Sequence, residues 1–315
     1  MIIINDRPGQ LCNRLWGFSF FIAFALKHNV KVYIPYFREY RSQFENLSSF
    51  PNIHFAIFKY SRTVDLPLYY CYRLAARVLR KVGSYIDLTL FGVYIDSTHW
   101  TEESWDSSLL MDKGKVIFLG SWLHPKEVAP LLEYKAEIIR LFEPRRIHKE
   151  RVDSLFTKLR SRFEKIIGVH IRRRDYRSFH GGAYFFDDSV YKRYMTAMQR
   201  TNEGEHLCFF VATDEDIQAA SFDGFNIARL EAPAMVEDLY GLSRCDYIFG
   251  PPSTFSMWAS FVGDVPLRIL KYRDENIHPD QFSPIVYQNV FRNGEHFRHG
   301  DENPLSIRHE KSFID

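Results

Sequence analysis

The sequence predicts an α/β protein whose strands form parallel sheets. Residues 2–34 read as a strand, a turn containing glycine, a helix and a second strand, which is the opening of a βαβ unit. The second half of the chain alternates short apolar strands with helix-like segments. Because consecutive parallel strands need a crossover connection, this alternation favours a doubly wound parallel sheet.

The individual elements are placed by apolar segments and by the turn residues that bound them. Strands are expected at residues 2–4, 32–34, 53–58, 115–120, 166–171, 207–211, 225–230, 247–249 and 268–270. Helices are expected at residues 13–28, 68–82, 124–142, 149–163, 189–200, 214–221, 236–244 and 254–261. Residues 145–148 look like the crossing between two halves, and the pattern is weakest over residues 36–112.

Length and charge limit the class of protein. A chain of 315 residues is on the order of two domains of average size, and it can bury a large core without a disulfide or a metal. The balance of 41 basic and 39 acidic residues leaves a net charge of +2, which argues against a general nucleic-acid-binding protein. Any recognition of anions is therefore expected at a local site.

The cysteines and the absence of long apolar segments favour a cytoplasmic protein. The four cysteines are widely spaced without a CxxC pair, so free thiols in a reducing compartment are expected rather than a zinc site. The N-terminus lacks the features of a signal peptide, and no apolar segment reaches the ~18 residues of a membrane span. Within residues 68–82, four basic side chains stand among apolar and tyrosine residues, which suggests either contact with anionic lipid or an ordinary solvated helix face.

The first candidate site is the segment His170-Ile171-Arg172-Arg173-Arg174-Asp175, which follows an apolar strand. In an extended continuation, His170, Arg172 and Arg174 share one face and Arg173 takes the other. An arginine fork matches the geometry of a diphosphate, and Asp175 can orient one guanidinium. The alternative is a solvated basic turn.

A second candidate site begins at Asp238 and continues to Ser256. Here a helix and a strand lead through Gly250-Pro251-Pro252 to a second helix that starts with Ser253 and Thr254. The N–H groups at the start of that helix can bind an anion. The alternatives are ordinary helix capping by Ser253 or Thr254, and a dipole-complementing role for Asp238.

Two further segments carry weaker signals. Gly9-Gln10-Leu11-Cys12-Asn13-Arg14-Leu15 is neither a dinucleotide-binding nor a P-loop motif, and Asn13 can simply cap a helix. Asp214 follows the strand at 207–211 and can accept a hydrogen bond from a ribose hydroxyl or cap a helix. Three strand ends in the second half carry arginine, hydroxyl or carboxylate groups, and in a parallel sheet these ends converge on one crevice, so a nucleotide or phosphate ligand is predicted.

These segments resemble motifs of a known enzyme family. Residues 168–176, Gly-Val-His-Ile-Arg-Arg-Arg-Asp-Tyr, resemble the HxRRxD motif of α-1,2- and α-1,6-fucosyltransferases. Residues 9–15 resemble the start of the bacterial α-1,2-fucosyltransferases, glycosyltransferase family 11, and residues 238–258 resemble a later motif of that family. Arg174 replaces the small residue usual in HxRRGD, and Cys12 and Arg14 replace the commoner Gly and Gln.

The resemblance implies a GT-B-like fold with two facing Rossmann-like domains. Together with the crossing at residues 145–148 and the polar residues after 276, it predicts an acceptor-side domain at residues 1–146, a donor-binding domain at 147–275 and an irregular tail at 276–315 that packs back on the body. It further implies inverting, metal-independent transfer of fucose from GDP-fucose to a glycan hydroxyl, with an α-1,2 linkage to galactose favoured. A lipid-linked acceptor would add peripheral membrane contact.

The resemblance also implies roles for individual residues. Arg172 would hold the β-phosphate, His170 would lie against the guanine side and Asp238 would read the guanine. Ser253 and Thr254 would bind phosphate, and Asn13 would line the cleft between the halves. Apart from the resemblance, Arg174, Asp214 and Phe255 are further candidates for the donor site, and Gly9 and Arg14 are further candidates for the acceptor side of the cleft.

The reaction class leaves the general base open. Transfer requires stabilisation of the departing diphosphate, which Arg172 can supply, and a base for the acceptor hydroxyl. His180 is the candidate base, with Asp175 and Asp187 as competitors and an exposed loop histidine as the alternative. A transferase that uses another nucleotide sugar and a non-catalytic nucleotide- or sugar-binding module are the rival functions.

Overall fold

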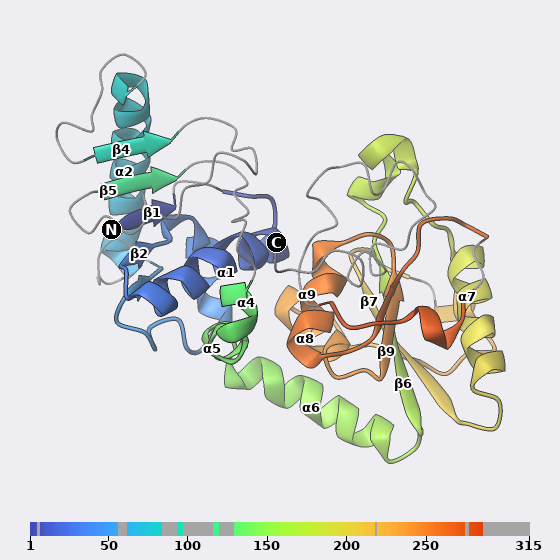
Figure 1. Ribbon diagram of the computed structural model, residues 1–315. Helices are drawn as coiled ribbons and strands as arrows, with labels where there is room; N and C mark the ends of the chain where they lie inside the picture. Colours follow the sequence, from blue (N-terminus) through green and yellow to red (C-terminus); the bar gives the residue numbers. More distant parts are fainter. Residues whose placement is uncertain are drawn as a thin grey trace. The chain divides into compact units, whose positions relative to one another are not determined.

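The computed structural model describes residues 1–4, 7–55, 62–83, 93–96, 116–119, 129–217, 219–274 and 277–285. The chain divides into two compact units, Met1–Glu143 and Pro144–Asp315. Each unit is built on a five-stranded sheet in which all neighbouring strands pair in parallel (Figure 1). The predicted α/β class, with a parallel sheet in each half, is therefore confirmed.

The N-terminal unit has the strand order β3-β2-β1-β5-β4. Its strands are β1 (Ile2–Ile4), β2 (Val32–Tyr33), β3 (Ile53–His54), β4 (Val93–Asp96) and β5 (Val116–Leu119). Its helices are α1 (Leu11–His28), the 3₁₀ segment η1 (Pro35–Gln43), α2 (Arg62–Gly83), α4 (Ala129–Glu133) and α5 (Lys135–Leu141). The α1 helix is buried along most of its length, and Asn29 ends it in the left-handed conformation.

The C-terminal unit has the strand order β10-β9-β6-β7-β8. Its strands are β6 (Lys165–Ile171), β7 (Leu207–Thr213), β8 (Ile227–Ala228), β9 (Tyr247–Gly250) and β10 (Leu267–Ile269). Its α-helices are α6 (Arg146–Arg160), α7 (Asp188–Thr201), α8 (Met235–Leu242) and α9 (Thr254–Gly263). Counted along the chain, the order is 3-2-1-4-5, which is the order of a doubly wound nucleotide-binding sheet, with its switch point between β6 and β9.

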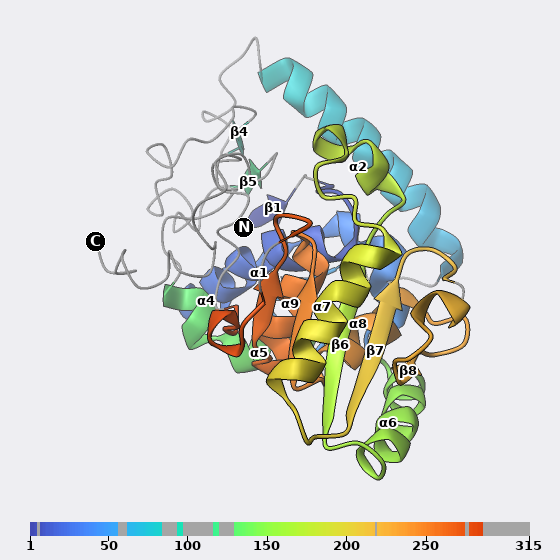
Figure 2. The ribbon, with the colours of Figure 1, turned by 90° about the vertical axis from the view of Figure 1, so that its right-hand side faces the viewer.

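The two faces of this sheet are covered by different helices. The α7 helix lies on one face, and α8 and α9 lie on the other (Figures 1 and 2). On the α7 side, Ile167, Val169 and Ile171 of β6 belong to one buried cluster with side chains of α7. Gly168 points the other way, since a Cβ there would meet Leu242 of α8 at 2.8 Å. The alternation along β6 therefore assigns even-numbered residues to the α8 and α9 side.

Most of the predicted elements are present, but several boundaries were wrong. The predicted helix at 214–221 is replaced by non-helical residues and a 3₁₀ turn, η5 (Ala219–Phe222), and the helix expected over 124–142 is interrupted at Tyr134. The α6 helix starts at Arg146, inside the predicted crossing. The strand β4 was not predicted. Residues 56–58, 115, 120 and 124–128, which were assigned to strands or helices, lie outside the described residues.

The described part of the C-terminal tail returns to the sheet. Leu267 and Ser283 form an antiparallel bridge, and the Ile285 N–H donates to Ser260 Oγ at 2.8 Å. The rest of the predicted tail, residues 286–315, lies outside the described residues. Among the helices that the structure describes, none is long and apolar enough to cross a membrane.

Candidate functional site

The site lies at the switch point of the C-terminal sheet. His170 is the penultimate residue of β6, and Gly250 ends the neighbouring strand β9. A Cβ at Gly250 would lie 2.6 Å from the carbonyl oxygen of His170 and 2.8 Å from its Cβ. Glycine is therefore required where β9 passes β6, and the two segments that follow these strands begin close together.

Arg172 connects these two segments. Its Nε and Nη2 donate to the two carboxylate oxygens of Asp175 at 3.0 and 2.6 Å, and its Nη1 donates to Ser253 Oγ at 3.1 Å. Its guanidinium also lies 4.7 Å from the centre of the Tyr176 ring. These partners hold a partly buried cation in one orientation at the carboxyl edge of the sheet.

The start of α9 adds a second positive element. Ser253 is the N-cap residue, and its fully buried hydroxyl accepts from the Phe255 N–H at 3.3 Å, so the predicted cap is confirmed. No acidic residue occupies the first turn of α9. The positive end of the helix dipole and the Arg172 guanidinium thus meet at Ser253, an arrangement that suits a phosphate or diphosphate.

Arg173 serves the fold instead. Its side chain is buried on the α7 side, as alternation predicted, where it donates to the Phe186 carbonyl at 2.8 Å and pairs with Glu215 at 3.1 Å and with Asp188. Its guanidinium also lies 5.5 Å from the centre of the Tyr191 ring. Each of these partners belongs to the surrounding scaffold, so Arg173 anchors the loop after β6.

Arg174 departs from the predicted alternation. Its backbone is helical, with φ −50° and ψ −69°, so the extended continuation assumed for the arginine run ends before it. Its side chain is exposed and forms no hydrogen bond or ion pair with any residue that the structure describes. The reason that placed Arg174 on the same face as Arg172 therefore does not hold.

Asp214 ties the loop to the neighbouring strand. Its two carboxylate oxygens accept from the backbone N–H groups of Arg173 and Arg174 at 3.0 and 3.2 Å. The carboxylate thus fixes the backbone that carries Arg172. No helix begins at Asp214, so the alternative of a helix cap was wrong.

His170 is buried under α9. Its ring lies 5.1 Å from the Phe255 ring, and its Nδ1 has no hydrogen-bond partner among the described residues. Burial, reinforced by the nearby Arg172 cation, lowers the pKa of His170 to about 3. The imidazole is therefore neutral at physiological pH.

Asp238 is a second buried polar group at this edge. It lies in the first turn of α8, and the start of this helix follows the carboxyl end of β8. The side chain is only 7% exposed and forms no hydrogen bond with a described residue. Burial raises the pKa of Asp238 to about 7, although Arg229 opposes the shift. A buried carboxylate without a partner is costly unless a ligand supplies donors.

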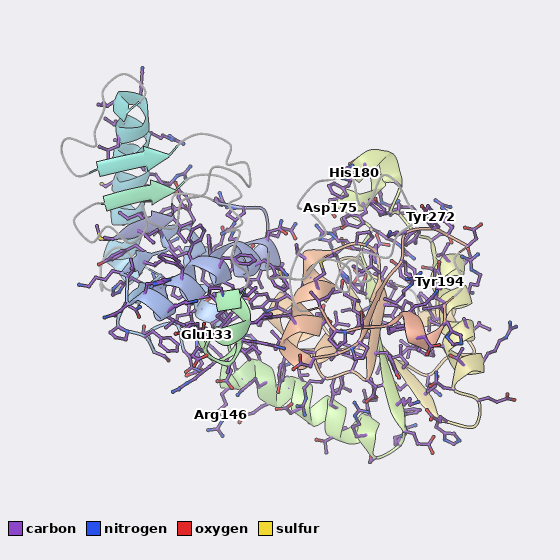
Figure 3. All side chains as sticks on the ribbon, in the orientation of Figure 1. Glu133, Arg146, Asp175, His180, Tyr194 and Tyr272 are labelled. Carbon is purple, nitrogen blue, oxygen red and sulfur yellow. The ribbon has the colours of Figure 1, made fainter. Side chains whose placement is uncertain are left out.

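The three candidate bases, Asp175, Asp187 and His180, have different surroundings in the structure. The hydrogen bond from Arg172 lowers the pKa of Asp175, and that from Ser189 lowers the pKa of Asp187, which also caps α7. His180 is exposed, lies at the same end of the unit as Asp175 (Figure 3), and contacts the rings of Phe179 and Tyr184. Both carboxylates are thus engaged and weakly basic, whereas the His180 ring forms no hydrogen bond with a described residue.

The loop that carries His180 has an unusual backbone. His180, Gly181 and Gly182 are consecutive residues with positive φ, at 49°, 66° and 79°. Glycine adopts this region freely, whereas histidine does so at a cost. The two glycines therefore permit the turn that presents His180.

The residues predicted for the acceptor side belong to the N-terminal unit. Gly9 has φ +38°, and a Cβ there would lie 2.1 Å from the Asn13 side chain, so the turn and the first turn of α1 pack closely. Arg14 is buried and donates to the carbonyls of Gly9 and Tyr36 at 3.0 and 2.6 Å. It also pairs with Glu39 and lies 4.9 Å from the Tyr40 ring. Arg14 therefore braces the loop, while Asn13 stays partly exposed at the helix start.

Sequence reasoning missed two residues of the site. Tyr176 is buried, its hydroxyl donates to the Pro252 carbonyl, and its ring supports Arg172. Burial raises the pKa of Tyr176 to about 12, so the hydroxyl keeps its proton. Gly250 is the other residue. In the sequence, the role of Tyr176 was indicated only by its position directly after the arginine run, and that of Gly250 only by its position at the end of β9.

Comparison with known proteins shows that the fold of this chain is similar to that of several solved structures. No protein-family model and no curated sequence matches the chain. The structure is similar to a mutant of Arabidopsis thaliana FUT1 in complex with GDP, with a TM-score of 0.52 and 13% identity over 90% of this chain and 73% of that chain. It also matches the Bradyrhizobium α-1,6-fucosyltransferase NodZ soaked with GDP-fucose, with a TM-score of 0.49 and 16% identity over 85% of this chain and 94% of that chain. At these identities the likeness concerns the fold alone.

Proposed function

We propose that this protein is a glycosyltransferase that uses a GDP-sugar, and that the donor is GDP-fucose. The observation that carries the proposal is Arg172, held by Asp175 and Ser253 at the start of α9. A guanidinium beside the positive end of a helix suits a diphosphate, in particular one that gains negative charge as it departs. The fold shared with FUT1, which was solved in complex with GDP, supports the choice of nucleotide.

Asp238 and His170 support guanine as the base. A guanine ring offers two neighbouring donors, N1–H and the exocyclic amine, to one carboxylate. Asp238 is a buried carboxyl group without a hydrogen-bond partner among the described residues, and His170 adds a buried nitrogen at the same edge of the sheet. We propose that Asp238 accepts from the guanine edge, and that Phe255 and His170 pack against the nucleotide.

The proposed reaction inverts the configuration at the sugar. The acceptor oxygen attacks C1 of fucose from the side opposite GDP, the new C1–O bond forms, and the bond from C1 to the diphosphate oxygen breaks. The acceptor proton passes to a base, for which His180 is the proposed group because Asp175 and Asp187 are engaged by hydrogen bonds. Arg172 and the start of α9 offset the charge on the departing GDP, so the proposed mechanism uses no metal.

The finer assignments rest on the sequence motifs. The resemblance to bacterial α-1,2-fucosyltransferases supports a glycan acceptor and an α-1,2 linkage to galactose. We propose that Gly9 and Asn13 act on the acceptor side. The four cysteines are free thiols, which supports a reducing, cytoplasmic setting.

A panel of donors tests the proposal. The protein is incubated with GDP-fucose, a second GDP-sugar, a UDP-sugar and an ADP-sugar, and released nucleotide is measured with and without galactose-terminated glycans. Release from GDP-fucose that rises with acceptor and persists in EDTA is expected. Faster release of nucleotide from another donor would show that this donor, and not GDP-fucose, is the substrate. GDP binding without turnover of any donor would favour a non-catalytic binding module.

A further inference from the structure

The α2 helix has two apolar faces, and one of them packs against other residues that the structure describes. On the inner side, Ala76 is 4% exposed, and Tyr69 and Tyr72 contact Tyr36 of η1 at ring distances of 5.8 and 6.1 Å. These residues are three and four apart, so they share one side of the helix. This side attaches α2 to the rest of the N-terminal unit.

The outer side carries a second apolar stripe. Tyr70, Leu74 and Val78 are 57%, 63% and 53% exposed, and their spacing of four residues places them in one row along the helix. Cys71 beside them is also exposed. A helix at the surface of a globular protein normally presents polar residues on its solvent-facing side. The exposed apolar stripe of α2 therefore needs an explanation other than packing within the unit.

The charged residues of α2 are mostly basic. The helix contains five basic residues, Arg62, Arg73, Arg77, Arg80 and Lys81, and one acidic residue, Asp65. Arg77 and Lys81 are exposed, and each lies three residues from a member of the apolar stripe. An exposed apolar row flanked by cations is complementary to a surface that offers both anionic groups and hydrocarbon.

We propose that the outer face of α2 docks onto a membrane surface rich in anionic lipid. Tyr70, Leu74 and Val78 would enter the boundary between headgroups and acyl chains, while Arg77 and Lys81 would contact lipid phosphates. The helix lies against the sheet near β4, and its last turns extend beyond that strand (Figure 1). The inference does not depend on the proposed transferase activity, because it concerns a surface of the N-terminal unit.

Sedimentation with lipid vesicles tests the proposal on the full chain. Binding to vesicles of phosphatidylcholine with 30% phosphatidylglycerol is expected to exceed binding to pure phosphatidylcholine by about tenfold or more, and to weaken in high salt. Leu74→Gln/Val78→Gln and, separately, Arg77→Gln/Lys81→Gln are each expected to reduce binding to anionic vesicles by about tenfold. Ile147→Gln is the matched control, since Ile147 has the same 63% exposure as Leu74 but lies on α6.

Several outcomes would overturn the proposal. Equal binding to both kinds of vesicle, binding that survives both double substitutions, or an equal loss in Ile147→Gln would each contradict it. A concentration-dependent dimer that Leu74→Gln/Val78→Gln abolishes, without vesicle binding, would assign the stripe to a second copy of the chain. Unchanged circular dichroism and unchanged GDP binding in the variants show that a loss of vesicle binding is local and separate from the donor site.

Discussion

The Arg172 Nη1 donates to Ser253 Oγ at 3.1 Å, and this bond joins the end of β6 to the first residue before α9. Ser253 at the same time accepts from the Phe255 N–H and so caps the helix. One hydroxyl therefore positions both the guanidinium and the start of the helix, and the two positive elements of the site cannot shift independently.

Arg173, unlike the neighbouring Arg172, is expected to stabilise the fold. Arg173→Ala removes the bonds to the Phe186 carbonyl, Glu215 and Asp188 and leaves the two carboxylates without their shared cation. The free energy of unfolding, measured in urea, is expected to fall by about 2–4 kcal/mol. Arg177→Ala, which breaks an exposed pair with Glu215 and a contact of the guanidinium with the Phe185 ring, is the control and should cost about 1 kcal/mol or less. Equal effects of the two substitutions would show that Arg173 is no anchor.

Asp175 is expected to act by positioning Arg172. Asp175→Asn keeps the size of the side chain but weakens its bidentate hold on the guanidinium, so turnover should fall by roughly tenfold. The pH profile of kcat should keep its shape, because the pKa of Asp175 is already held low by Arg172. If Asp175 were the base, the loss would approach 10²–10⁴ and the acidic limb of the profile would disappear.

The affinity for GDP is expected to depend on pH through the ionisation of Asp238. Its carboxylate must be ionised to accept from guanine, and its pKa is about 7. GDP affinity should therefore be high above pH 7 and fall about tenfold for each pH unit below it. Asp238→Asn should bind GDP more weakly, with no such dependence. Calorimetric titrations at pH 6, 7 and 8 measure both, and a wild-type affinity that is flat across this range would contradict the assignment.

The raised pKa of Asp238 also predicts that the stability of the nucleotide-free protein falls as the pH rises, whereas the affinity for GDP increases. The folded-state pKa of Asp238 is raised from 3.8 to about 7, so the neutral form is favoured by folding. Its contribution to stability is complete below pH ~4 and is lost as the pH rises through 7, by an amount on the order of a few kcal/mol. Without nucleotide, Asp238→Asn should therefore exceed the wild type in thermal stability at pH 8. Equal melting temperatures at pH 8 would show that the carboxyl is not strained by burial.

Gly250 is expected to tolerate no side chain. Gly250→Ala places a Cβ within 2.6 Å of the His170 carbonyl oxygen and should separate the ends of β6 and β9, with a cost of about 1–3 kcal/mol and a loss of GDP binding. Gly17→Ala is the control, because its Cβ would meet only Pro8 at 3.7 Å within a helix, where alanine is favoured. Retention of GDP affinity in Gly250→Ala would mean that the two strand ends need not be close.

The sequence predicted the scaffold of the site better than the role of each side chain. The apolar segment before His170 and the cap at Ser253 are local patterns, so the strand, the helix and the opposite faces of Arg172 and Arg173 could be predicted. Arg174 was assigned by extending that alternation, and this failed because the backbone turns helical there. Arg14 was read as a residue of the cleft, whereas its partners at Tyr36 and Glu39 are distant in sequence and only the fold reveals them.

The contribution of Tyr176 and Gly250 could not be predicted for the same reason. Tyr176 matters through the Pro252 carbonyl and Gly250 through His170, and each contact joins segments about 80 residues apart that meet only at the switch point. A single sequence shows which residue types are present, but not which strands become neighbours.

Calorimetric titration of GDP into the wild-type protein and into Arg172→Ala tests most directly whether the β6 and α9 segments hold a guanosine diphosphate. Arg172 lies at the surface of the strand ends and is only partly buried, so the variant is expected to fold normally by circular dichroism. The wild type should bind GDP but neither UDP nor ADP with comparable affinity, and Arg172→Ala should bind GDP about 10²-fold more weakly. Equal GDP affinity in the two proteins, or no preference for GDP in the wild type, would contradict the proposed site.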